Sequence, residues 1–161
     1  MDGLEDRSAV PQPVDAWTGE VPVAPPDGAG GVEVGEFLIR AAEYAWNTGD
    51  TGLLGQAGTD RCEVCEDVGR RIEELYGAGG WGDQVRYEGL AVHSHGPHPD
   101  DAAVEVVVAT FTSGARSMYA PGSAPREAEP RAQAVEAHIC GSGEGSARRV
   151  CWMTAIGEEL G

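Results

Sequence analysis

The pattern of hydrophobic residues changes once along the chain, near residue 81, and this change limits the possible fold more than any other feature. Before it, apolar residues recur every three or four positions, as in amphipathic helices. After it, the stretches 84–95, 102–113, 132–140 and 148–157 are rich in Val, Thr and aromatic residues, as in strands. Helices followed by strands predict an α+β fold, with two main N-terminal helices packed on a strongly curved antiparallel sheet.

The residues before position 81 predict two helices. The first has apolar residues at helical spacing from Val34 and should end near Gly49. Its opposite side, expected to face solvent, carries four polar residues: Glu36, Arg40, Glu43 and Asn47. The second helix is predicted to begin at Thr59 or Asp60 and to end in the glycine-rich stretch 77–80.

The N-terminal segment differs from the rest in composition. Residues 8–31 are rich in Pro, Ala and Gly and follow neither a helical nor a sustained strand period. We therefore predict a tether over residues 1–32 and a domain over residues 33–161. The alternative is an extended strap that docks on the sheet through three apolar side chains: Trp17, Val21 and Val23.

The overall charge excludes some partners. Eleven basic residues against 27 acidic ones give the 161-residue chain a net charge of -16, which repels nucleic-acid backbones. No stretch approaches the roughly 18 consecutive apolar residues of a membrane span. We expect a soluble chain that does not bind nucleic acid.

Four cysteines permit two disulfides, in three possible connectivities. Helical spacing favours a bond between Cys62 and Cys65. If Cys140 faces Cys151 across the last two strands, one face of that pair becomes wholly apolar, so hydrophobic alternation favours this second bond. In that register Ile139, Ala137 and Val135 lie opposite Trp152, Thr154 and Ile156.

Two other roles for the cysteines remain open. Cys62 and Cys65 form a CxxC at the start of a helix, a position where redox motifs occur, but nearby acidic residues oppose thiolate formation. The four cysteines could instead hold zinc, although the second pair lacks the short spacing of a zinc ribbon.

A histidine cluster is the candidate metal site. The residues that could form a first shell lie within eight positions of one another: His93, His95, His98 and Asp100. The alternative is a polar hairpin tip that happens to contain imidazoles.

Three segments resemble a known family: Thr48-Gly49-Asp50-Thr51, Asp60-x-Cys62-x-x-Cys65 and Glu73-x-Leu75-Tyr76-x-x-Gly79-Gly80. The chain resembles, over about residues 33 to 157, a family of actinobacterial lipoproteins of unknown function. Its domain is similar to the nuclear transport factor two-like cone, in which helices pack into a strongly bent sheet. The resemblance implies export, a lipid anchor on an upstream Cys as the means of membrane attachment, and an extracytoplasmic, envelope-associated location. It supplies no catalytic residues.

A cone of this kind usually encloses a pocket between its helices and sheet. Seven aromatic residues are candidates to line that pocket, although they could equally be plain core: Phe37, Trp46, Tyr76, Trp81, Tyr87, Phe111 and Trp152. We predict a non-catalytic binding or interaction module, without a cofactor, whose partner is an unknown protein or a small apolar ligand. The alternative is a small-molecule isomerase or hydrolase that uses a carboxylate or His in the pocket.

The strand at 102–113 has apolar side chains on both faces. Val104, Val106 and Val108 alternate with Val107, Ala109 and Phe111. A sheet that is apolar on both faces needs two covers. The helices supply one, and a second subunit or the tether supplies the other. We predict a weak homodimer through the outer face of the sheet.

Overall fold

The computed structural model describes residues 20–26, 28–59, 61–83, 85–114, 116–120, 122, 124, 126–141 and 148–156. Most of the predicted tether, including Trp17, lies outside the described residues, as does Asp60. Two of the three side chains of the predicted strap do not dock on the sheet, because Val21 is 55% exposed and Val23 is 83% exposed.

The described elements follow the predicted order, with helices first and strands after. The helices are α3 (Gly31–Thr48), α4 (Gly52–Ala57) and α5 (Glu63–Gly77). The strands are β1 (Trp81–Asp83), β2 (Tyr87–His98), β3 (Asp101–Ser113), β4 (Arg116–Tyr119), β5 (Arg126–Ala128), β6 (Arg131–Cys140) and β7 (Arg149–Ala155). All strand pairs within the two sheets are antiparallel, so the fold is α+β. None of the described helices is long and apolar enough to cross a membrane.

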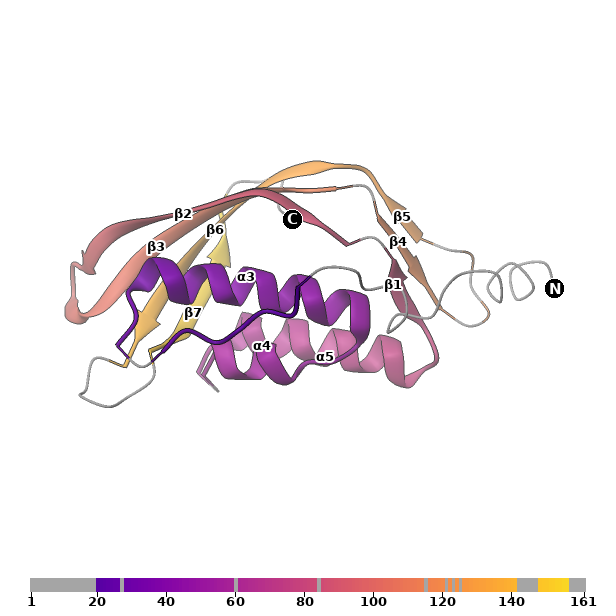
Figure 1. Ribbon diagram of the computed structural model, residues 1–161, viewed down its shortest axis with the longest axis horizontal. Coiled ribbons are helices and arrows are strands. Elements are labelled where there is room, and N and C mark those ends of the chain that lie inside the picture. The colour runs from indigo at the N-terminus through magenta and orange to yellow at the C-terminus, as the bar shows by residue number, and fades with distance from the viewer. Residues whose placement is uncertain are drawn as a thin grey trace.

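The strands form two sheets instead of the single sheet predicted. The larger has the order β2-β3-β6-β7, and the smaller has the order β1-β4-β5. Figure 1 shows the long strands β2, β3 and β6 arching over α3, with α4 and α5 on the other side of α3 and the small sheet at one end. Helix α3 is therefore enclosed between the large sheet and the other two helices.

Both long helices begin at positions that the sequence did not predict. Helix α3 starts at Gly31, three residues before Val34. Helix α5 starts at Glu63, and its N-cap is Cys62 instead of Thr59 or Asp60. The sulfur of Cys62 accepts a hydrogen bond from the backbone N–H of Cys65 at 3.2 Å. A sulfur atom thus takes the capping position that Ser, Thr, Asp or Asn usually fills.

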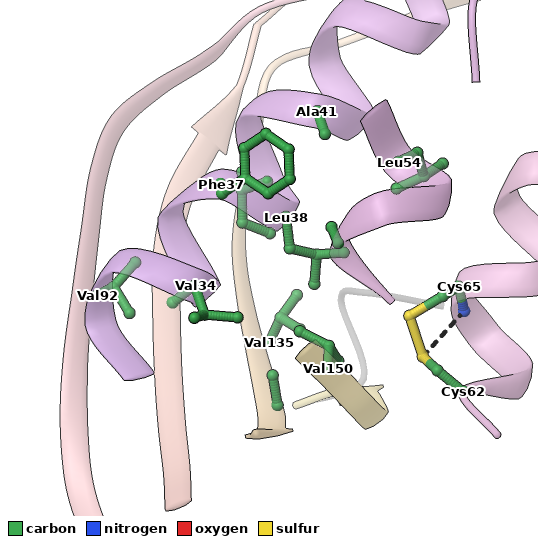
Figure 2. Packing of buried hydrophobic residues seen from close by; sticks show 14 of the residues in the cluster. Val34, Phe37, Leu38, Ala41, Leu54, Cys62, Cys65, Val92, Val135 and Val150 are labelled. Atoms are coloured by element: carbon green, nitrogen blue, oxygen red, sulfur yellow. Dashed lines mark hydrogen bonds between the residues drawn. A yellow bond between two sulfur atoms is a disulfide. The ribbon is translucent and has the colours of Figure 1, made fainter. Parts of the chain in front are cut away.

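The core lies between α3 and the large sheet (Figure 2). Val34, Leu38 and Ala41 of α3 are almost fully buried, and α4 and α5 add Leu54 and Ile72. The sheet contributes alternate residues of each strand, as period-two patterning requires: Val107, Ala109 and Phe111 from β3, Val135, Ala137 and Ile139 from β6, and Val150 from β7.

The predicted register of the last two strands is wrong by one residue up to His138 and by two residues beyond it. Trp152 lies opposite His138, not Ile139, and Met153 lies opposite Ala137. A register shift follows between His138 and Ile139, beyond which Ile139 pairs with Val150. The bulge moves Trp152 to the outer face, because a shift of one residue reverses the face that a side chain occupies.

Two residues of the polar side of α3, Glu43 and Asn47, are buried where the sequence predicted exposure, whereas Glu36 is exposed as predicted. Asn47 donates from Nδ2 to the Val85 carbonyl at 2.7 Å, and its Oδ1 accepts from the Val85 N–H at 3.1 Å. Glu43 accepts from the Tyr87 N–H at 2.7 Å, while Arg40 donates to the Tyr87 carbonyl at 2.8 Å. Arg40 also pairs with Glu43 at 3.2 Å. These side chains satisfy the backbone of residues 85–87 as a neighbouring strand would.

The N-terminal end of α3 is fixed by Glu105 of β3. Its carboxylate accepts from the Gly31 N–H at 3.1 Å and from the Ser94 hydroxyl at 2.6 Å, and it pairs with Arg148 at 3.0 Å. A Cβ at position 31 would lie 2.5 Å from the Glu105 side chain, so only Gly permits this approach. Partial burial pushes the pKa of Glu105 upward, but the bonds from Ser94, Arg148 and Gly31 outweigh it and hold the pKa below its usual value of 4.5.

Replacement of Asn47 should reveal how much the buried polar side of α3 stabilises the fold. Asn47→Ala leaves the buried Val85 N–H without its partner and removes one of two donors to the Val85 carbonyl, the other being Nη1 of Arg86 at 3.0 Å, so we expect the free energy of unfolding to fall by about 1–3 kcal/mol. Urea denaturation measures this loss. The control Glu36→Ala, at an exposed position of the same helix, should change stability by less than about 0.5 kcal/mol. Similar small losses in both variants would contradict the structural role of Asn47.

Glu105→Gln should make stability less sensitive to acid. A carboxyl whose pKa is lowered by folding stabilises the protein above its unfolded pKa, and this stabilisation is lost as pH falls through the folded pKa. At pH 7 we expect the variant to be roughly 1 kcal/mol less stable than the parent. The difference should shrink below pH 4.5, the usual pKa. Urea titrations between neutral and acidic pH measure it, and a difference that widens in acid would contradict the assignment.

Candidate functional site

A large concave site lies where the C-terminal ends of α3 and α5 face the small sheet. It is a cleft of about 860 Å³, within the usual size range of small-molecule sites. Its walls are mostly apolar, with charged residues among them: Trp46, Arg71, Glu74, Leu75, Ala78, Val85, Tyr87, Arg116, Met118, Ala120, Ala124, Arg126, Glu127 and Ala128.

Only two of the seven aromatic candidates, Trp46 and Tyr87, line this cleft. Phe37 and Phe111 are core residues, and Phe111 packs on Tyr87 with ring centroids 4.8 Å apart. Trp81 is buried and stacked on Tyr119 at 5.1 Å.

The other two candidates, Tyr76 and Trp152, lie elsewhere. Tyr76 donates from its hydroxyl to the Trp46 carbonyl at 2.7 Å and accepts from the Gly82 N–H at 3.1 Å. It therefore fastens the end of α3 to β1. Its ring packs against Gly49, whose φ of 80° and lack of Cβ leave room for it. Trp152 is 43% exposed on the outer face of the large sheet, so its assignment to the pocket is wrong.

Tyr87 is held in the wall of the cleft by its backbone and its ring. Glu43 and Arg40 bind its N–H and carbonyl, and Phe111 supports the ring. Burial raises the pKa of Tyr87 to about 12; the Arg116 charge acts in the opposite direction and the Glu43 charge raises the pKa further. Tyr87 thus presents a neutral phenol at physiological pH.

The predicted metal site does not assemble. His93, His95 and Asp100 are exposed, and no group of three His, Cys, Asp or Glu side chains in the described parts of the chain could hold a metal ion. His98 instead contacts His138, which was not part of the predicted site. The centroids of the two rings are 5.0 Å apart. Strand pairing, not closeness in sequence, decides which imidazoles meet.

A second concave site lies on the outer face of the large sheet. His138 packs on Trp152 with ring centroids 4.3 Å apart, and Glu136 binds its Nε2 at 2.8 Å. The pocket beside them measures about 330 Å³ and is bordered by the Cys140–Cys151 disulfide. The rings of His138 and Trp152 line this pocket, and the half-buried Val104 of β3 borders it.

The structure joins Cys62 to Cys65 and Cys140 to Cys151, which are the two pairs that the sequence favoured. All four cysteines are therefore used, which leaves no thiolate set for zinc. Cys62 is fully buried and Cys65 nearly so, and a buried disulfide is poorly accessible to a redox partner. These bonds fasten the start of α5 and the end of the large sheet.

Sequence reasoning missed the residues that complete the cleft. Arg116 and Met118 come from β4, and Arg126 comes from β5. These short strands carry only a weak strand pattern, so they were not predicted. The alternation of side chains in Arg-Ser-Met-Tyr, which places Arg116 and Met118 on one face, was the one sequence feature that could have indicated strand β4.

The homodimer through the outer sheet face stays a prediction. Val104, Val106 and Val108 are half-buried on this face, and Trp152 extends it. Trp152→Glu would place a charge in the predicted interface, so we expect light scattering to show a dimer of the parent at high concentration and a monomer of the variant. Val23→Glu adds the same charge at an exposed position outside this sheet and should leave the dimer intact. A monomeric parent would contradict the prediction.

Comparison with known proteins gives a family and a similar fold. The crystal structure of the intermembrane space region of the chloroplast protein ARC6 is similar, with a TM-score of 0.60 and 12% sequence identity. The similarity covers 81% of this chain and 99% of that one, and at this identity it concerns the fold alone. No curated protein matches the chain significantly. Residues 25–140 match a family of unknown function, DUF6318, and the chain belongs to this family.

Proposed function

We propose that the protein is a non-catalytic binding module of the cell envelope, and that the cleft between α5 and the small sheet takes an apolar ligand. The observation that carries this proposal is the cleft itself, about 860 Å³ in volume. Its apolar side chains come from separate elements of the fold: Trp46 from α3, Leu75 from α5 and Met118 from β4. A concave apolar surface of this size is typical of binding sites for small molecules.

The charged groups around the cleft favour binding over acid–base catalysis. Its two described carboxylates, Glu74 and Glu127, are exposed, and the side chain of Glu74 lies 3.9 Å from Arg70. The buried carboxylate of Glu43 has both oxygens engaged, by Arg40 and by the Tyr87 N–H. A general base needs a free oxygen within reach of the substrate. The isomerase or hydrolase alternative therefore has less support.

The two disulfides support a location outside the cytoplasm, because such bonds persist in oxidising compartments. The arch of the large sheet over α3 (Figure 1) supports a further part of the proposal, that the domain is of the nuclear transport factor two-like kind. Attachment through an upstream lipid anchor and an actinobacterial source belong to the proposal as well, and they depend on the sequence resemblance alone.

Binding of a neutral apolar dye tests the proposal. N-phenyl-1-naphthylamine fluoresces in apolar surroundings, and we expect saturable binding of one dye per chain. Ala128 lies in the wall of the cleft, so Ala128→Trp should fill part of it and weaken binding at least about tenfold. Titration by fluorescence measures the dissociation constant.

Ala103→Trp is the matched control for this variant. Ala103 is an exposed residue of β3 and does not line the cleft, so this change should leave dye binding as in the parent. Absence of saturable binding in the parent, or equal loss in both variants, would refute the proposal. Thermal unfolding of each variant confirms that a loss of binding is not a loss of fold.

A further inference from the structure

The small sheet forms one wall of the cleft, and this wall carries two arginines. Arg116 of β4 lies opposite Ala128 of β5, and Met118 lies opposite Arg126. Residues paired across two strands project from the same face of the sheet. The four side chains therefore share one face, and all of them border the cleft.

Arg116 is held in place by neutral groups. Its Nη1 donates to the Ser113 hydroxyl at 3.3 Å and to the Gly114 carbonyl at 3.4 Å. Ser113 is only 1% exposed and is fixed in turn by Gln133, which donates to it at 3.0 Å. Because these acceptors carry no net charge, they orient the guanidinium without neutralising it.

No carboxylate neutralises this pair of arginines within the described part of the chain. Neither Arg116 nor Arg126 takes part in any of the ion pairs there. Arg71, the remaining cation of the cleft, is different, because Asp67 binds it at 3.1 Å. Two arginines without a carboxylate partner therefore lie on one wall of the cleft, in a chain of net charge -16.

The acidic residue nearest to them in sequence does not compensate them. Glu127 also borders the cleft, but it pairs with Ser117, and strand alternation places its side chain on the opposite face from Arg126. The wall next to Arg116 is formed by Tyr87, whose phenol is neutral, and by Met118. An uncompensated cation therefore lies beside apolar surface.

We propose that the ligand of this cleft is a small amphipathic anion, a carboxylate carried by an aliphatic or aromatic body. Arg116 binds the carboxylate, Arg126 adds a second positive charge at the mouth, and the body packs against Trp46, Leu75 and Met118. Arginine suits this role because its planar guanidinium binds carboxylates through two parallel hydrogen bonds. This inference rests on the proposed binding function and adds the chemical class of the ligand.

Competition with the neutral dye tests the inference, with octanoate and octanamide as probes of nearly equal size. We expect octanoate to displace the dye with a dissociation constant at least about tenfold lower than that of octanamide. Arg116→Gln should remove most of this preference and leave octanamide binding unchanged. Arg61→Gln makes the same charge change on the outer-face pocket, so it should keep the preference.

Equal displacement by octanoate and octanamide in the parent protein would overturn the inference, and it would leave the binding function intact because the dye still binds. An unchanged preference in Arg116→Gln would also overturn it. Absence of dye binding together with absence of octanoate binding by calorimetry would refute both proposals. The parent comparison needs no variant, so the test holds even if Arg116→Gln does not fold.

Discussion

The pairing of one side of α3 with the backbone of residues 85–87 is the interaction on which the rest of the structure depends. Asn47 and the Arg40–Glu43 pair bind Val85 and Tyr87 at the point where the chain leaves β1 and enters β2. Residues 85–86 belong to neither sheet and need partners for their buried polar groups. By supplying them, α3 fixes where the small sheet lies relative to the helices, and this position creates the cleft.

The two ends of α3 are fixed by different means. At the N-terminal end, the Glu105 carboxylate binds the Gly31 N–H and compensates the positive end of the helix dipole. At the C-terminal end, Tyr76 packs on Gly49 and bonds the Trp46 carbonyl. A helix held at both ends and along its polar side cannot slide within the arch of the sheet. The wall of the cleft that α3 forms is therefore built on a fixed helix, as selective binding requires.

The cleft and the pocket on the outer face of the large sheet differ in chemistry. The cleft combines apolar side chains with Arg116 and Arg126, which suits an amphipathic anion. The outer face combines an exposed Trp152 with half-buried valines of β3 and the bordering Cys140–Cys151 disulfide, which suits contact with another protein surface. The proposed ligand site and the predicted interaction surface thus lie on separate parts of the fold.

Local patterns in the sequence determined the element order and the α+β class, because spacing of 3.6 or 2 residues distinguishes helices from strands. The sequence also favoured both disulfide pairs, although the strand register used for Cys140 and Cys151 was wrong. Tertiary structure alone decided three other features. It buried Glu43 and Asn47, since the backbone of residues 85–87 needed hydrogen bonds that no local pattern encodes. It moved Trp152 outward through a one-residue bulge. It brought Arg116 to Trp46 across the cleft, because contacts between distant segments depend on strand pairing and not on sequence spacing.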